Sequence, residues 1–72
     1  MEEIMKNFGD KIKEKRKSKN MKIYDLALKS GISAIELSSI ENSKRKPRMA
    51  TLKKISEALE CDFDELFHLI YD

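Results

Sequence analysis

Basic side chains are the most distinctive chemical groups of this 72-residue chain, because they are concentrated in two stretches. Glu14 is the only acidic residue among the many cations of residues 11–22, and residues 44–54 contain no acidic side chain. Residues 55–72, in contrast, contain no Lys or Arg. Clustered cations attract a polyanion because binding releases the counterions condensed on it. The charge pattern therefore indicates either a nucleic-acid partner or a set of solvated helix faces.

Groups suited to catalysis or metal binding are scarce. The chain has one histidine, His68, one cysteine, Cys61, and no glycine-rich loop that could cradle phosphate. We therefore expect no enzymatic activity, no metal or other cofactor, and no small-molecule ligand. A buried thiol is the expected role of Cys61, and a single cysteine suits the reducing cytoplasm. The sequence has neither a signal-peptide pattern nor an apolar run that could cross a membrane, so we expect a cytoplasmic protein without membrane contact.

One stretch, residues 26–41, is organised to hold side chains against a partner. Gly31 can adopt positive φ and so end one helix, and Ser33 can cap the next one with Glu36 in capping-box position. The apolar residues of the stretch share one side at helical spacing: Leu26, Ile32, Leu37 and Ile40. Two helices that bury one common apolar surface across a tight turn form a helix-turn-helix unit, here over about residues 23–42.

The rest of the chain predicts further helices and no strand, so the fold class is all-α. Apolar side chains recur with a period near 3.6 in segments at about residues 7–19, 23–29, 34–42 and 49–60, and a fifth helix follows Asp62. Asn7 is the expected cap of the first helix, and Asn20 is its expected left-handed stop. We predict one domain over residues 7–72, preceded by a loose arm over residues 1–6.

From Phe8 to Phe67 the chain resembles the lambda-repressor-like helix-turn-helix domains of the Cro/CI or XRE type. The matching positions are Ile12, Arg16, Leu26, Ala27, Gly31, Ile32, Ser33, Leu37, Ile40, Glu41, Lys44, Arg45, Pro47, Leu52, Ile55, Ala58, Leu59, Leu66 and Phe67. The resemblance implies a compact five-helix bundle that binds double-stranded DNA sequence-specifically, usually as a homodimer on a two-fold operator. It also implies a structural ion pair between Arg16 and Glu41.

Three side chains are the expected base contacts. Leu37 and Ile40 must face the core, which turns Ala34, Ile35 and Ser39 outward on the helix that enters the major groove. Ala34 and Ile35 offer only apolar contact, most naturally to thymine methyl groups, so we expect a preference for A·T pairs. Glu36 has two possible roles, as a capping residue and as an acceptor from cytosine N4.

Phosphate contacts are expected from a further set of side chains at the edges of the motif. The set is Lys22, Ser33, Lys44, Arg45, Lys46 and Arg48. The family commonly has glutamine at the position of Ile23, where isoleucine cannot donate a hydrogen bond, so core packing is its expected role. Surplus apolar residues at the end of the chain, Leu69, Ile70 and Tyr71, either finish the core or form a dimer patch.

The predicted function is that of a small transcriptional regulator, a repressor that occludes a promoter. Repression is expected on two grounds: the resemblance to the family, and the lack of a sensor or activation domain in this sequence. The alternative is a protein-interaction module, an antitoxin or regulatory partner, that uses the same helices against protein. The weak hydrogen-bonding capacity of Ala34 and Ile35 keeps this alternative open.

Overall fold

The structure is a computed structural model that describes residues 8–71, and all regular structure within this range is helical. The helices are α1 (Phe8–Ser18), α2 (Ile23–Ser30), α3 (Ala34–Glu41), α4 (Met49–Leu59) and α5 (Phe63–Tyr71). The all-α, five-helix prediction is confirmed, and the ends of α1 to α4 lie within about one residue of the predicted ones. The predicted arm at residues 1–6 and the predicted cap Asn7 lie outside the described residues.

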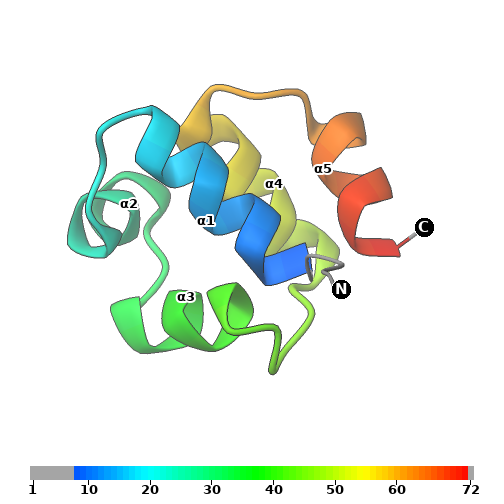
Figure 1. The fold of residues 1–72 in the computed structure, drawn as a ribbon, viewed down its shortest axis with the longest axis horizontal. Coiled ribbons are helices and arrows are strands. Elements are labelled where there is room, and N and C mark those ends of the chain that lie inside the picture. Colours follow the sequence, from blue (N-terminus) through cyan, green and yellow to red (C-terminus); the bar gives the residue numbers. More distant parts are fainter. Residues whose placement is uncertain (1–7, 72) are drawn as a thin grey trace, which may run out of the picture.

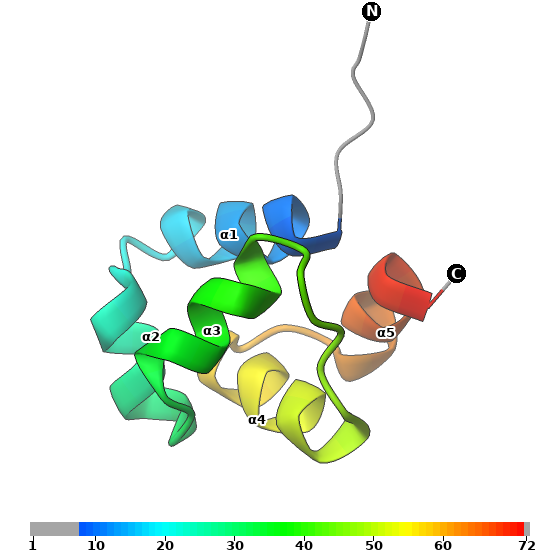
Figure 2. The ribbon, with the colours of Figure 1, turned by 90° about the horizontal axis from the view of Figure 1, so that it is seen from below.

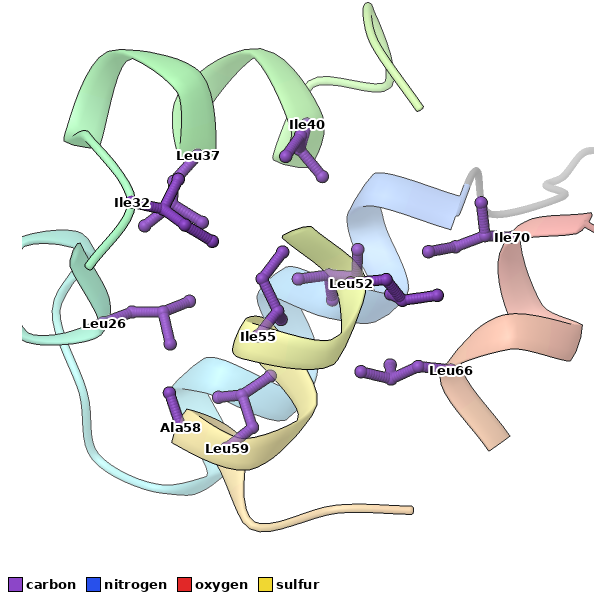
Figure 3. Close-up of a cluster of buried hydrophobic side chains, with 11 residues drawn as sticks. Leu26, Ile32, Leu37, Ile40, Leu52, Ile55, Ala58, Leu59, Leu66 and Ile70 are labelled. Atoms are coloured by element: carbon purple, nitrogen blue, oxygen red, sulfur yellow. The ribbon is translucent and has the colours of Figure 1, made fainter. Parts of the chain in front are cut away.

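The five helices pack around a single apolar core that α4 crosses near its centre (Figures 1 and 3). Every helix and the α2–α3 turn contribute buried side chains: Ile12, Leu26, Ile32, Leu37, Ile40, Leu52, Ile55, Ala58, Leu59, Leu66 and Ile70. Ile23 packs partly buried against this core, in the role expected for it. Removing this apolar surface from water is the main force that holds the short helices together.

Four helices end at residues with left-handed backbone, and only one of these residues is glycine. They are Asn20 (φ 58°), Gly31 (φ 75°), Ser43 (φ 59°) and Glu60 (φ 56°). After α3, for example, Lys44 N donates to Ser39 O at 2.9 Å and Ser43 N donates to Ile40 O at 3.0 Å. This pair of bonds satisfies carbonyls that a helix end otherwise leaves free. The ends at Asn20 and Gly31 agree with the sequence predictions, whereas those at Ser43 and Glu60 were not predicted.

Helix α1 approaches the C-terminal end of α3 so closely that only glycine fits at the contact. A methyl group on Gly9 would lie 2.3 Å from the carbonyl oxygen of Glu41 and 2.4 Å from that of Ile40. Gly9 N also donates a hydrogen bond to Ser43 Oγ at 3.1 Å. The first turn of α1 therefore fixes the point at which α3 ends and the next segment leaves.

None of the helices in the described range is both long and apolar enough to cross a membrane. The longest, α1 and α4, have 11 residues each. A membrane-spanning helix needs about 20 apolar residues.

Candidate nucleic-acid interface

The turn between α2 and α3 is fixed by short-range hydrogen bonds from two serines. Ser33 caps α3, since its Oγ accepts from Glu36 N at 3.1 Å. Ser30 is buried, and its Oγ donates to Leu26 O at 2.7 Å and accepts from Ile32 N at 3.2 Å. The Ser33 cap was predicted from the sequence, whereas the hydrogen bonds of Ser30 were not. Together these bonds and the left-handed Gly31 fix the turn through which α3 follows α2.

The outer face of α3 carries the predicted base-contacting residues. Ile35 is 83% exposed, and Ala34 and Ser39 are partly exposed beside it. Asn42, directly after the helix, is also exposed, and its Nδ2 lies 3.5 Å from Ser38 Oγ. Asn42 was not predicted as a contact residue, although it lies seven residues after Ile35, two helical turns further along the same face. Its amide adds hydrogen-bonding capacity to a face that is otherwise apolar or hydroxylated.

A buried ion pair holds α3 against α1. Arg16 Nε donates to Glu41 Oε2 at 2.8 Å and Arg16 Nη2 donates to Glu41 Oε1 at 3.0 Å, a two-point contact. Arg16 Nη1 also donates to Met21 O at 2.8 Å, in the α1–α2 connection. The hydrogen bonds that Arg16 donates to Glu41 raise the pKa of its guanidinium, although burial opposes the shift. The predicted ion pair is present, and it fixes the C-terminal end of α3.

The residues predicted to contact phosphate are all exposed, and they come from two parts of the chain. Lys22 and Ser33 are exposed at the N-terminal ends of α2 and α3. The other four are exposed in residues 43–48 of the connection between α3 and α4, which we call the basic loop: Lys44, Arg45, Lys46 and Arg48. Figure 2 shows that α3 and this loop lie together on the near side of the molecule. The basic loop thus lies beside α3.

The basic loop is anchored to α5 at its C-terminal end. Pro47 is buried, and its carbonyl oxygen accepts a hydrogen bond from the Tyr71 hydroxyl. The ammonium of Lys46 lies over the Tyr71 ring, 5.4 Å from the ring centre. Of the predicted loop cations, Lys46 is therefore already held by a cation–π contact, which leaves Lys44, Arg45 and Arg48 as the more available ones.

The structure separates the three residues predicted for a dimer patch. Ile70 is 5% exposed and belongs to the apolar core, so its assignment to a surface patch is wrong (Figure 3). Leu69 is partly buried against the same core, and Tyr71 is 41% exposed. Ile70 is buried because it continues the inward face of α5 one turn beyond Leu66. Of the predicted patch, Tyr71 has the most surface free for a second copy of the chain.

Cys61 and the possible metal-ligating side chains are the remaining candidates for chemistry. Cys61 is partly buried between α4 and α5, and burial raises the pKa of its thiol, which keeps it protonated at neutral pH. The thiol is therefore a poor nucleophile and packs against the core. Within residues 8–71 no group of three or more His, Cys, Asp or Glu side chains could hold a metal ion.

The helix-turn-helix of α2 and α3, supported by α1, α4 and α5, defines the lambda-repressor-like class of all-α domains. Residues 12–66 match the family described as Helix-turn-helix (HTH_3). The chain belongs to this family, in its Cro/CI-like, XRE-type form. The expectation from the resemblance is confirmed for family and fold.

Relatives of known name support the same assignment. The HTH-type transcriptional repressor RghR of Bacillus subtilis is 38% identical over 65 residues, which cover 89% of this chain and 48% of RghR. The control protein C.MunI of a Mycoplasma species is 40% identical over 72 residues, which cover 93% of this chain and 92% of C.MunI. The chain thus spans about half the length of the Bacillus relatives and nearly all of C.MunI.

Among solved structures, a similar one is that of SinR of Bacillus subtilis, described as the master regulator for biofilm formation, in complex with DNA. Its TM-score is 0.79 at 34% identity, and the match covers 83% of this chain and 97% of that chain. The likeness therefore extends over most of the chain.

Proposed function

We propose that this domain is a transcriptional repressor that binds double-stranded DNA sequence-specifically, as a homodimer on a two-fold operator. The observation that carries the proposal is the placement of the exposed face of α3 beside the exposed cations of the basic loop. A helix of this motif enters the major groove with its N-terminal residues toward the base edges. The match to RghR, a named repressor, and to DNA-bound SinR supports this function.

In the proposed complex, base contacts come from Ala34, Ile35 and Ser39. Ile35 is the most exposed of the three and has an apolar side chain, so it fits the methyl group of thymine better than any polar base edge. Ser39 adds a hydroxyl that can donate or accept. Readout that depends on apolar contact favours A·T pairs at the centre of each half-site.

Affinity in the proposed complex comes largely from phosphates. Lys22 and Ser33 hold the backbone at one side of α3, and Lys44, Arg45, Lys46 and Arg48 hold it at the other. Exposed cations at these positions neutralise phosphates and release counterions. Two protomers place their reading helices about 34 Å apart, one turn of duplex, so the operator has two half-sites at that spacing.

Selection of bound duplexes from a random pool tests the function directly. The expected consensus is a two-fold sequence with A·T pairs in each half-site, at a spacing of about one helical turn. Ile35→Ala should weaken binding to the selected duplex about fivefold, the effect of losing one apolar contact, and leave random duplex unaffected. A consensus that consists of G·C pairs alone would contradict the assignment of Ile35.

A protein-interaction module is the second candidate, and one observation favours it. Tyr24 is 72% exposed and Leu28 is 85% exposed, one turn apart on the outer face of α2. Large apolar side chains on a surface are typical of protein contacts when they are adjacent. Binding to no duplex at low salt in the selection experiment would favour this candidate.

A further inference from the structure

The basic loop is held at its start by α1 and at its end by α5. These two helices are the first and the last of the described chain. At the start, Ser43 has left-handed backbone and its Oγ accepts from Gly9 N at 3.1 Å. At the end, the Pro47 carbonyl accepts from the Tyr71 hydroxyl, 24 residues further along the chain. Only three residues, Lys44, Arg45 and Lys46, lie between these two anchors.

Tyr71 is itself held firmly enough to act as an anchor. Its ring lies 5.2 Å from the ring of Phe67, one turn earlier in α5, and the two planes are inclined by 31°. The ammonium of Lys46 lies on the Tyr71 ring, so both the hydroxyl and the ring contact the loop. One side chain of α5 therefore fixes a backbone carbonyl and a cation of the loop at the same time.

We infer that Tyr71 is a positioning residue for DNA binding, which holds the basic loop in the conformation that meets the phosphates. This inference rests on the proposed function. A loop already ordered in the free protein loses less conformational entropy when it binds. The hydroxyl of Tyr71 touches no DNA in this arrangement and acts through Pro47 on Lys44 and Arg45.

The inference gives the end of α5 a role within one protomer. In the dimer patch predicted from the sequence, removal of Tyr71 would affect only complexes with two protomers. A positioning role instead predicts an effect on the binding of a single protomer to any sequence. The two roles can therefore be told apart by the duplex on which removal of Tyr71 weakens binding. A positioning role affects a short random duplex, whereas a dimer contact affects only a duplex with two half-sites.

The test uses Tyr71→Phe, which removes the hydroxyl and keeps the ring. The probe is a random-sequence duplex of about 10 base pairs, one helical turn, which admits a single protomer. Tyr71→Phe should raise the Kd on this duplex about threefold to tenfold, the range of one net hydrogen bond. Amide exchange at Lys44, whose N–H donates to Ser39 O, should become faster in the free protein, while the circular dichroism of the helices stays the same.

A matched control is Glu65→Gln, which also removes one polar contact of α5. The Glu65 carboxylate lies 3.0 Å from the Lys15 ammonium of α1 and does not touch the loop. This variant should bind the short duplex as the wild type does. In an Arg45→Ala background, Tyr71→Phe should lose part of its effect, because both changes act on the same loop.

Three results would overturn the inference while leaving the proposed function intact. The first is an unchanged Kd for Tyr71→Phe on the short duplex although Arg45→Ala weakens it. The second is an effect confined to a duplex with two half-sites, which would assign Tyr71 to the dimer contact. The third is an undiminished effect in the Arg45→Ala background. Failure of the wild type to bind any duplex would instead overturn the proposed function.

Discussion

Arg16 joins three parts of the chain through one guanidinium. It contacts Glu41 at two points and the carbonyl of Met21, and only 8% of the residue is exposed. Two charges taken out of water need this degree of hydrogen bonding, because an unpaired charge in the interior is strongly unfavourable. The pair therefore stabilises the fold only as a pair, and each partner depends on the other.

Glu41→Gln should lower the free energy of unfolding by about 3 kcal/mol, because it leaves the Arg16 charge buried without a counter-charge. Urea denaturation measures the change. Arg16→Met combined with Glu41→Met should recover most of the lost stability, since neither charge remains. Glu65→Gln, which breaks the exposed Lys15–Glu65 pair, should cost less than about 1 kcal/mol. Equal effects of Glu41→Gln and Glu65→Gln would contradict this account.

Helix α1 and the α2–α3 turn use their glycines for opposite reasons. Gly9 has an ordinary helical backbone, but its missing side chain lets α1 touch the carbonyls at the end of α3. Gly31 has open space around it and a φ of 75°, so its role is conformational. One glycine sets a distance between helices, and the other sets the direction of the chain.

Alanine substitutions separate these roles. Gly9→Ala should destabilise the fold by about 2 to 3 kcal/mol, because α1 must move away from rigid backbone atoms of α3. Gly31→Ala should cost about 1 kcal/mol, the strain of a left-handed alanine, and leave the packing of α1 unchanged. Thermal unfolding gives the two stabilities, and amide chemical shifts of Ser43 report whether the α1–α3 contact has moved. A Gly9→Ala variant as stable as the wild type would refute the close contact.

Local patterns predicted the helices well, because a 3.6-residue apolar period and the signals at Asn20, Gly31 and Ser33 lie within each element. Contacts between helices were harder to predict from the sequence. Nothing near Gly9 in the sequence shows that carbonyls of α3 lie against it, and nothing near Tyr71 shows that it reaches Pro47. Ile70 was assigned partly to the surface because the end of the chain gave no indication of what lies beneath it.

The candidate site was predictable to a similar extent. The loop cations are evident from composition, since no acidic residue interrupts them, and the outward face of α3 follows from the inward positions of Leu37 and Ile40. The hold of Tyr71 on Lys46 is a tertiary contact over 25 positions of sequence and has no local signal. Asn42 was missed because the predicted helix ended there, although its amide continues the exposed face.

Charge is distributed unevenly over the whole molecule, and this asymmetry orients it toward a polyanion. The basic loop lies beside α3, whereas residues 55–72 contain acidic side chains and no Lys or Arg. A field of one sign on one side steers the approach of a charged partner. The acidic side chains in the first turn of α5, Asp64 and Glu65, repel phosphates, whereas Tyr71 at the other end of the same helix contacts the basic loop.

The salt dependence of the DNA-binding constant reports how many phosphates the basic loop neutralises. If the four loop cations each neutralise one phosphate, log K should fall with log[salt] at a slope of about −3.6 per protomer. Lys44→Ala should reduce the slope by about 0.9 and weaken binding to selected and random duplexes alike. Lys17→Ala, on the exposed surface of α1 outside the proposed interface, serves as the matched control and should leave the slope unchanged. A loss for Lys44→Ala on the selected duplex alone would exclude a phosphate contact.

The buried face of α1 allows only one register of this helix against the rest of the bundle. Gly9, Ile12 and Arg16 are the buried residues of this helix, and each meets a different kind of partner: backbone carbonyls, apolar side chains and a carboxylate. If α1 docked one turn out of place, a side chain would collide with the carbonyls and the guanidinium would be buried without Glu41. Such misaligned states are penalised twice, so the short bundle selects a single arrangement of its reading helix before any DNA is present.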